Sequence, residues 1–237
     1  MFPESGLLNI NKPKGITSFA VVHRVKKVIG VKKVGHCGTL DPMAQGVLLV
    51  VFGKATKLQD KLMRCEKTYL AKILFGTTTD TDDITGTIIE QKPFEPFGVS
   101  EVNMALSTFV GELAQIPPMF SAIKVQGKKL YQLARAGISI ERKERLVTVN
   151  SIETIECDGK SVLCTIKCSS GTYVRSIARD LGQKLGCGAT LEFLRRESSG
   201  VFSYADSIDM QEINKDNIEN LMQKVISIET LMSLTNA

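Results

Sequence analysis

The sequence predicts a mixed α/β fold of the α+β kind, with a mainly antiparallel sheet and helices flanking it. Two observations support this class. Stretches rich in β-branched residues, such as residues 47–52 and 67–75, are interspersed irregularly with stretches of helical periodicity, such as residues 18–29. The regular strand–helix alternation that accompanies a parallel sheet is not seen. The 237 residues, 43% of them hydrophobic, suffice for one large domain with a buried core.

Each expected element begins and ends at recognisable residues. Ser18 is a suitable N-cap for the first helix, and Gly30 ends it. Residues 32–43 form a glycine-rich polar connection, and residues 112–125, which contain two prolines, are expected to be a loop. Further strands are expected at residues 7–11, 86–91, 146–157, 161–168 and 172–175, and further helices at residues 100–109, 128–136, about 176–185 and 216–224.

Composition and termini indicate a cytoplasmic protein. Residues 1–6 carry an acid and a proline but no basic stretch, so they do not resemble a signal peptide. The longest clearly apolar run, residues 47–52, is too short to cross a bilayer. The six cysteines show no paired framework and are interpreted as reduced thiols. They are Cys37, Cys65, Cys157, Cys164, Cys168 and Cys187.

The net charge of +5, with a pI near 8.8, is concentrated in one segment. Residues 122–146 hold seven basic and two acidic residues, whereas the rest of the chain holds 23 of each. A solvated helix face is the common interpretation of such a run. Flanking prolines and glycines favour a protruding arm that binds a phosphate backbone. The basic residues are Lys124, Lys128, Lys129, Arg135, Arg142, Lys143 and Arg145.

Residues 35–42 (GHCGTLDP) are the first candidate for chemistry. The two glycines permit close backbone approach, and Asp41 precedes a proline, so it should be extended and project its carboxylate from a rigid turn. From composition alone, Asp-Pro is more commonly a turn element. A His36–Cys37 nucleophile pair is an alternative. Side chains of sequence neighbours tend to diverge, however, and no third orienting group is in view.

Other chemistries lack a matching pattern. Two histidines and scattered cysteines argue against zinc, and residues 79–83 are not followed by the oxygen ligand and glycine that an EF-hand needs. No phosphate-binding or dinucleotide-binding fingerprint is present, so no metal and no cofactor are expected. Tyr173 and Arg175, two residues apart in an expected strand, would point the same way. They could face a base and an acid together, or form a surface cross-strand pair.

Seven motifs occur in the order in which one enzyme family has them. Together they resemble the bacterial tRNA pseudouridine synthases that modify uridine-55, the TruB family, over about residues 5–205. This resemblance implies the pseudouridine synthase fold, with a cleft and a thumb insertion at about residues 115–146. The motifs are LNINKP (8–13), GHCGTLDP (35–42), KTY (67–69), IPPMFSA (116–122), GKKLY (127–131), GTYVR (171–175) and LRR (194–196).

The resemblance also implies roles for individual residues. Asp41 corresponds to the catalytic nucleophile, Tyr69 to the tyrosine that stacks on the target base, and Tyr173 to a second tyrosine that contacts it. Arg175 corresponds to the arginine that pairs with the aspartate. Attack at the sugar C1′ and attack at the base C6 both stay open. Leu194 is expected to form an apolar wall of the pocket, and His36 to support the flipped-out nucleotides. Lys12 is expected to pack beside the site together with Pro13. The residues expected to contact the RNA backbone are Lys124, Lys128, Lys129, Arg135, Arg142 and Arg196.

The expected organisation is a catalytic domain at residues 1–210 and a short helical extension at residues 211–237. Many relatives carry a C-terminal PUA domain, for which the 30 residues after Ser207 are too few. The expected partner is the T-arm of tRNA, with no membrane and no obligate protein partner. The alternatives are a synthase acting on another RNA and a non-catalytic RNA-binding or RNA-folding protein. The presence of Asp41 together with Tyr69, Tyr173 and Arg175 argues against a protein that only binds RNA, because such a protein does not need the carboxylate.

Overall fold

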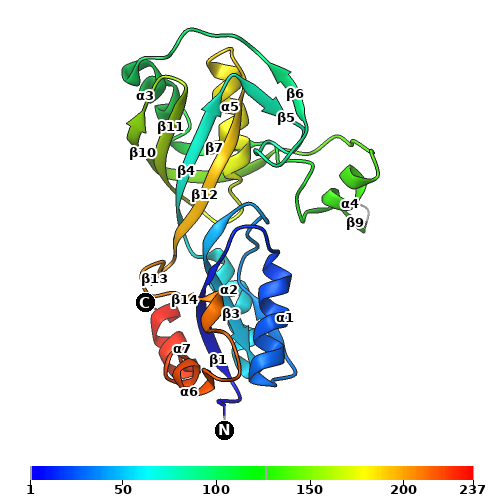
Figure 1. Ribbon diagram of the computed structural model, residues 1–237, viewed down its shortest axis with the longest axis vertical. Helices are drawn as coiled ribbons and strands as arrows, with labels where there is room; N and C mark the ends of the chain where they lie inside the picture. Colours follow the sequence, from blue (N-terminus) through cyan, green and yellow to red (C-terminus); the bar gives the residue numbers. More distant parts are fainter. Residues whose placement is uncertain (1, 126, 237) are drawn as a thin grey trace. The chain divides into compact units, whose positions relative to one another are not determined.

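The computed structural model describes residues 2–125 and 127–236, apart from the side chains of residues 124, 129, 235 and 236. The chain divides into two compact units. We call Met1–Tyr69 together with Leu194–Ala237 the terminal unit, and Leu70–Phe193 the central unit. Strands β4 (Lys67–Phe75) and β12 (Ala189–Ser199) each have residues in both units (Figure 1).

A mixed, mainly antiparallel sheet carries the fold, which confirms the predicted class. Its strands follow the order β14, β1, β3, β12, β4, β11, β10 and β7, with β2 paired to β3 and β13 to β12. β14 runs parallel to β1 and β12 parallel to β3, whereas β1 with β3 and β10 with β11 and β7 are antiparallel. The other strands of this sheet are β1 (Gly6–Lys12), β2 (Val34–His36), β3 (Gln45–Phe52), β7 (Gly111–Gln115), β10 (Arg145–Cys157), β11 (Ser161–Cys168), β13 (Phe202–Ser203) and β14 (Ile208–Asp209).

Short hairpins and helices complete the chain. β5 pairs antiparallel with β6, and β8 pairs antiparallel with β9. No helix within residues 2–125 and 127–236 is long and apolar enough to span a bilayer. These elements are β5 (Thr77–Thr79), β6 (Ile88–Gln91), β8 (Lys124–Val125), β9 (Lys128–Lys129), α1 (Ser18–Ile29), α2 (Gln59–Arg64), α3 (Val99–Ser107), α4 (Leu130–Arg135), α5 (Val174–Lys184), α6 (Ile218–Gln223), α7 (Ile228–Asn236) and the 3₁₀ turns η1 (Gly53–Leu58) and η2 (Met210–Glu212).

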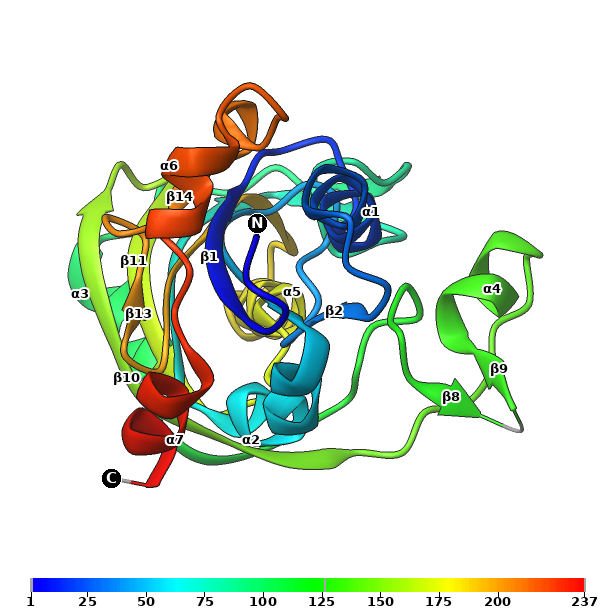
Figure 2. The same cartoon turned by 90° about the horizontal axis from the view of Figure 1, so that it is seen from below.

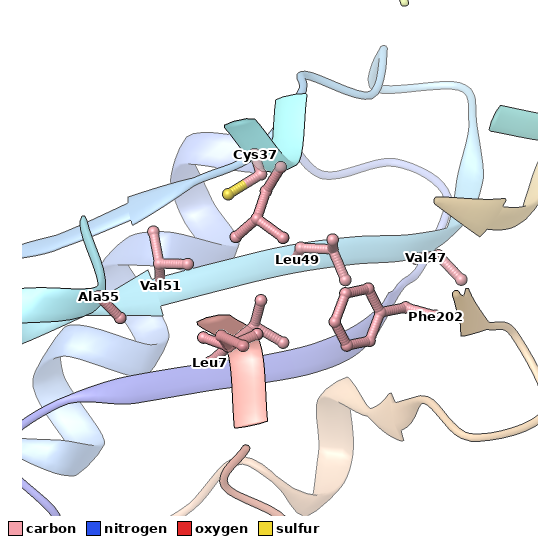
Figure 3. Packing of buried hydrophobic residues seen from close by; sticks show 9 residues of the cluster. Leu7, Cys37, Val47, Leu49, Val51, Ala55 and Phe202 are labelled. Atoms are coloured by element: carbon pink, nitrogen blue, oxygen red, sulfur yellow. The ribbon is translucent and has the colours of Figure 1, made fainter. Parts of the chain in front are cut away.

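The terminal unit is built on the β1–β3 ladder. Figures 1 and 2 place α1 on one side of β1, with α6 and α7 on the other. Side chains of Leu7, Leu49, Val51 and Phe202 form an apolar cluster between β1, β3 and β13 (Figure 3). Burying a side chain of this size contributes roughly 1.5–3 kcal/mol to folding. The cluster therefore fixes the position of β3. Asp41 lies in the segment that directly precedes this strand.

The central unit packs α5 through Ile177, Ala178 and Leu181, which recur at the spacing of a single buried helix face. The segment at residues 115–146, which we call the basic arm, contains the β8–β9 hairpin and α4. These elements project from the rest of the central unit (Figures 1 and 2). Within the arm the Leu130 side chain is fully buried, and its amide donates to the Ile123 carbonyl at 2.8 Å.

Residues 172–175 do not form the expected strand. Tyr173 is the N-cap of α5, and Arg175 lies in the first turn of that helix. Gly171 has a φ of +88°, and Thr172 Oγ1 donates to the Ser169 carbonyl at 3.0 Å, so the chain turns here. This turn overrides the strand propensity of the β-branched and aromatic residues. Tyr173 and Arg175 therefore do not share a strand face.

The structure also differs from the sequence prediction at the bounds of several other elements. Thr17 rather than Ser18 caps α1, because its side chain accepts the Ala20 amide at 3.1 Å. Residues 111–115 are not a loop but β7, which gains its backbone partners from β10. The expected helix at residues 128–136 begins only at Leu130. Strand β12 was not predicted, because its charged residues interrupt the apolar pattern that marks a strand.

Candidate active site

The GHCGTLDP loop is fixed from the N-terminal end of α1. Ser18 Oγ donates to the Leu40 carbonyl and accepts from the Leu40 amide, each at 2.9 Å. The Gly15 amide donates to the Pro42 carbonyl at 2.7 Å. The residues on both sides of Asp41 are thus held, while Asp41 itself is half-buried. A carboxylate on such a loop is aimed before any substrate arrives, which is the condition for effective catalysis.

Lys12 supports this loop from within the protein. The residue is fully buried, and Nζ donates to the carbonyls of Pro13, Ile16 and Pro42 at 2.9, 2.8 and 3.5 Å. Burial lowers the pKa of Lys12 to about 8, against the opposing effect of the Asp41 carboxylate and with a further lowering by Arg196. Lys12 therefore holds the backbone next to Asp41 and attracts the Asp41 carboxylate, while its own ammonium is shielded from solvent.

Arg196 is also buried, with 1% of its surface exposed. Its Nε donates to the Val47 carbonyl at 2.6 Å and its Nη2 to the Gly38 carbonyl at 3.1 Å. Gly46 has a φ of +101°, and a Cβ there would lie 2.4 Å from the Arg196 carbonyl oxygen, so only glycine fits this approach of β3 to β12. The predicted contact of Arg196 with the RNA backbone does not agree with this burial. The residue instead ties the loop to the sheet.

His36 and Cys37 do not form a nucleophile pair. Burial raises the pKa of the Cys37 thiol to about 12, so the reactive thiolate is scarce at neutral pH. Burial also lowers the pKa of His36, and Arg196 adds to this effect, so the ring is neutral at pH 7. His36 Nδ1 is buried without a hydrogen-bond partner among the described residues. The neutral, half-buried ring suits a packing contact better than proton transfer.

Tyr69 and Leu194 belong to the same unit as this loop. Tyr69 lies in β4 with 9% of its surface exposed, and Leu194 lies in β12 with 6% exposed. The terminal unit thus contains Asp41 and the expected stacking and wall residues. Tyr173 and Arg175 belong to the central unit.

Tyr173 is held by a side chain that the sequence motifs did not include. Gln115, with 1% of its surface exposed, accepts the Tyr173 amide at Oε1 (2.8 Å) and donates from Nε2 to the Tyr173 carbonyl (3.1 Å). The Tyr173 carbonyl also accepts the Ser176 amide at 3.1 Å, which begins α5. The end of β7 therefore fixes the residue that precedes the helix. Gln115 lies at the start of the basic arm, one residue before the IPPMFSA motif, and no signal in the sequence marked it.

Arg175 is enclosed by the loops around α5. Its Nη1 donates to the Thr81 carbonyl at 2.9 Å and its Nη2 to the Phe120 carbonyl at 2.8 Å. Its Nε lies 3.8 Å from Asp83 Oδ2. Asp83 is itself buried and accepts the Thr85 amide at 2.9 Å. These contacts fix the guanidinium, and the pairing with Asp41 stays a prediction from the family resemblance.

One turn further along α5, Arg179 pairs with a second acid. Its Nη1 lies 3.3 Å from Asp82 Oδ2, and its Nη2 donates to the Ile116 carbonyl at 3.2 Å. Burial raises the pKa of Asp82, and Arg179 opposes this shift more than any other neighbouring charge. The acidic turn at residues 80–85 is thus a partner of α5. Two arginines at a spacing of four and two adjacent acids are the signal in the sequence that could have indicated this pairing.

The basic arm presents some of its expected RNA contacts to solvent. Lys128 and Arg135 are exposed, and the Arg135 guanidinium lies 5.5 Å from the centre of the Tyr131 ring. Arg142 is half-buried and donates from Nη1 to the Pro117 carbonyl at 3.1 Å, so it braces the arm's base. The side chains of Lys124 and Lys129 lie outside the described part of the structure.

Comparison with known proteins identifies the family. The family model described as TruB family pseudouridylate synthase (N terminal domain) matches residues 26–174. The chain belongs to the TruB family. A model of the tRNA pseudouridylate synthase B C-terminal domain matches residues 175–233 of this family member. The resemblance carried by the seven motifs is thereby confirmed.

Individual relatives of the chain are consistent with this family assignment. A protein named tRNA pseudouridine synthase B from Endomicrobium trichonymphae is 46% identical over 223 residues, which are 94% of this chain and 96% of that protein. One of the same name from Alkaliphilus oremlandii is 46% identical over 219 residues, 92% of this chain and 73% of that protein. Among solved structures, a chain of a Cbf5–Nop10–Gar1 complex matches with a TM-score of 0.75 and 28% identity. That match covers 98% of this TruB-family chain but only 62% of the other.

Proposed function

We propose that this chain is a tRNA pseudouridine synthase that isomerises uridine-55 in the T-loop to pseudouridine, acting in the cytoplasm with Asp41 as its nucleophile. The family and the relatives named tRNA pseudouridine synthase B support the reaction and the substrate. The observation that carries the assignment of Asp41 is the loop itself. Its backbone is bonded to Ser18 and Gly15, and a buried Lys12 lies beside the acid.

The substrate must leave its stack before it reacts. A T-loop uridine lies inside folded RNA, so the enzyme extrudes it and replaces the original stacking with protein surface. Tyr69 supplies an aromatic face for the base, and Leu194 an apolar wall. Both are largely buried, as a pocket lining requires. The neutral ring of His36 supports the displaced nucleotides without adding charge.

The nucleophile must be ionised to attack. The Asp41 carboxylate and the Lys12 ammonium attract each other, and this attraction raises the pKa of Lys12 against the effect of its burial. Arg175, whose donors are fixed by protein carbonyls, adds its charge to Asp41 in the working enzyme, as the family resemblance implies. Backbone carbonyls hold the Lys12 ammonium in place, so it need not reorganise when the charge on the aspartate changes.

The reaction exchanges one glycosidic bond for another. The N1–C1′ bond breaks, the base rotates, and a C5–C1′ bond forms. The C5 proton is lost and N1 gains a proton, so no oxidant or reductant is consumed. Asp41 forms the covalent intermediate, at either C1′ or C6, and is released when the new product is complete. Tyr173, held at its backbone by Gln115, lies on the base and assists removal of the C5 proton.

The replacement Asp41→Asn tests the assignment. The variant should bind tRNA but lose at least about a thousandfold in single-turnover rate, equivalent to about 4 kcal/mol of barrier. Pseudouridine mapping of a tRNA transcript incubated with excess enzyme measures the rate. Asp60→Asn, the same change at an exposed position on α2, is the matched control and should react normally.

The outcomes separate the competing functions. An Asp41→Asn rate within tenfold of wild type would remove Asp41 from the mechanism. Wild-type protein that binds tRNA but forms no pseudouridine would indicate a binding protein. Pseudouridine at another position, or in another RNA only, would keep the reaction and change the substrate.

A further inference from the structure

A second basic segment lies at the start of the chain. Residues 5–40 contain seven lysines and arginines and no acid. The even charge balance outside residues 122–146 conceals this segment, because residues 41–121 and 147–237 each contain three more acidic than basic residues. Much of the positive charge of the chain therefore lies in the basic arm and in this segment, and residues 54–72 add six basic residues against two acids. The seven residues are Lys12, Lys14, Arg24, Lys26, Lys27, Lys32 and Lys33.

Helix α1 presents much of this charge on one face. Its buried residues are Ser18, Val21, Val22, Val25 and Ile29, which share one side of the helix. Phe19, His23, Lys26 and Lys27 recur at spacings of three, four, seven and eight residues, so they share the opposite side. All four are exposed, and Phe19 has 73% of its surface in solvent. Among the described residues Phe19 is the one exposed phenylalanine or tyrosine side chain, and it shares this helix face with two cations.

The exposed lysines of this segment have no acidic partner among the described residues. In the described part of the chain, Lys26 and Lys27 take part in no ion pair, and the exposed Lys14, Lys32 and Lys33 likewise take part in none. Arg24 is different, because its Nε donates to the Ile213 carbonyl at 2.8 Å. This bond directs Arg24 to the flank of α1 that packs against the C-terminal segment. The face with Phe19 and the lysines is left for an external partner.

This face begins beside the candidate nucleophile. Ser18, the neighbour of Phe19, holds both backbone groups of Leu40, and Asp41 follows directly. From that end, α1 extends for 12 residues, a length of about 18 Å at the usual helical rise. Phe19 therefore lies at the end of α1 that contacts the Asp41 loop, and Lys26 and Lys27 lie further along the helix. All of these residues belong to the terminal unit.

We propose that the exposed face of α1 binds the substrate RNA next to the target nucleotide. Phe19 stacks on an unpaired base, and Lys26 and Lys27 contact the phosphates that follow it. RNA fits the face because exposed aromatics and lysines together are the features that bind single-stranded nucleotides. A lipid surface fits less well, since Phe19 is the one large apolar residue on the described exposed face, and membrane helices need a broad apolar side. This inference rests on the proposed function for the identity of the RNA.

The salt dependence of binding tests the lysines. Lys26→Ala with Lys27→Ala should reduce the slope of log affinity against log salt by roughly 0.7 to 0.9 for each phosphate that is no longer bound. Alanine suits an exposed helical position, so the fold should be kept. The matched control is Lys160→Ala with Lys184→Ala, which removes the same charge from two exposed lysines of the central unit. Filter binding of a tRNA transcript at several salt concentrations gives the slopes.

Phe19→Ala tests the stacking separately. Without one stacked base, binding should weaken by roughly five- to a hundredfold, from the 1–3 kcal/mol typical of a base–aromatic stack. The slope should stay the same, because every phosphate keeps its lysine partner. Phe19→Tyr keeps an aromatic face and should bind nearly as wild type does.

Three results would overturn the proposal: an unchanged slope in the lysine variant, a slope change of equal size in the control, or full affinity in Phe19→Ala. Binding to vesicles of anionic lipid that depends on Phe19, with no effect on RNA, would assign the face to a membrane and also overturn it. Binding is measured without turnover, so these results are independent of whether uridine is converted. Failure of wild-type protein to form pseudouridine would instead count against the proposed function.

Discussion

At the scale of single residues, buried cations organise the candidate site. Lys12, Arg175 and Arg196 are each almost fully buried, and each donates to protein carbonyls. A buried charge without such partners would be very costly, so the carbonyls are a condition of the fold. All three residues lie in the sequence motifs, but Arg196 was expected to contact RNA and is buried instead. The sequence could not show that they would be buried, because lysine and arginine are rarely so.

The lowered pKa of Lys12 gives opposite trends for stability and activity. Between pH 8 and the ordinary lysine pKa of 10.5, the unfolded chain holds more protons at this residue than the folded one. The free-energy cost of burying the charged Lys12 therefore declines as the pH rises across this window. Activity should fall over the same window, because Asp41 loses a neighbouring positive charge. The single-turnover rate of wild type should decline above pH 8 while the contribution of Lys12 to stability rises.

Two variants assign this decline to Lys12. Lys12→Met should be slower at pH 7 and show no further decline of this kind above pH 8. Lys12→Arg, if it turns over, should keep its rate at higher pH, because arginine does not lose its proton there. Rates at fixed ionic strength from pH 6.5 to 9.5 provide the measurement. A wild-type profile that is flat over this range, or an unaltered decline in Lys12→Met, would contradict the assignment.

At the scale of elements, the sequence was informative where one face of a strand or helix is apolar. β4 and β11 have the predicted bounds, and β1, β3 and α1 differ by a residue or two. β12 was not predicted, because charged residues interrupt the apolar pattern along it. It is a strand because it pairs with β3 on one side and β4 on the other. The start of α5 was mistaken for a strand, because the turn at Gly171 cannot be distinguished from strand propensity without tertiary contacts.

The basic arm was predicted as a protrusion, and its base is clamped to α5. Ser176 Oγ donates to the Ile116 carbonyl at 2.9 Å, and Arg175 Nη2 donates to the Phe120 carbonyl. These bonds join the part of the arm nearest the sheet to the helix that carries Arg175. The clamp was invisible in the sequence, since its acceptors are backbone carbonyls that any residue supplies.

The exposed lysines of the arm should contribute to RNA capture. Lys128→Ala with Lys143→Ala should weaken tRNA binding and reduce the salt slope by roughly 0.7 to 0.9 for each phosphate that the arm no longer binds. Both side chains are exposed, so no packing is removed. When these changes are combined with those at Lys26 and Lys27, the reductions should add, because each lost phosphate contact lowers the slope by its own amount. A slope that matches the Lys160 and Lys184 control would exclude a role for the arm in electrostatic capture.

At the scale of the whole molecule, the basic segments limit how much RNA the chain can hold. Residues 41–121 and 147–237 each carry a net charge of −3. Within the first of these ranges, residues 54–72 hold six basic and two acidic residues, so its acidic excess lies outside that stretch. Long-range charge affects association more than it affects the fold, so this distribution bears on the substrate. The arm, the α1 region and residues 54–72 are the stretches of net positive charge that can supply the electrostatic part of recognition.

An isolated T-arm hairpin should therefore be modified nearly as well as whole tRNA, with kcat/KM within about tenfold, or 1.4 kcal/mol. Both substrates are compared at one fixed salt concentration. The variant with alanine at positions 26 and 27 distinguishes where α1 binds. If α1 contacts the T-arm itself, the variant loses the same factor on hairpin and on tRNA. A hairpin penalty of a hundredfold or more, about 2.7 kcal/mol of transition-state binding, would mean that contacts outside the T-arm are needed. If that penalty vanished in the α1 variant, α1 would be the element that makes those distant contacts.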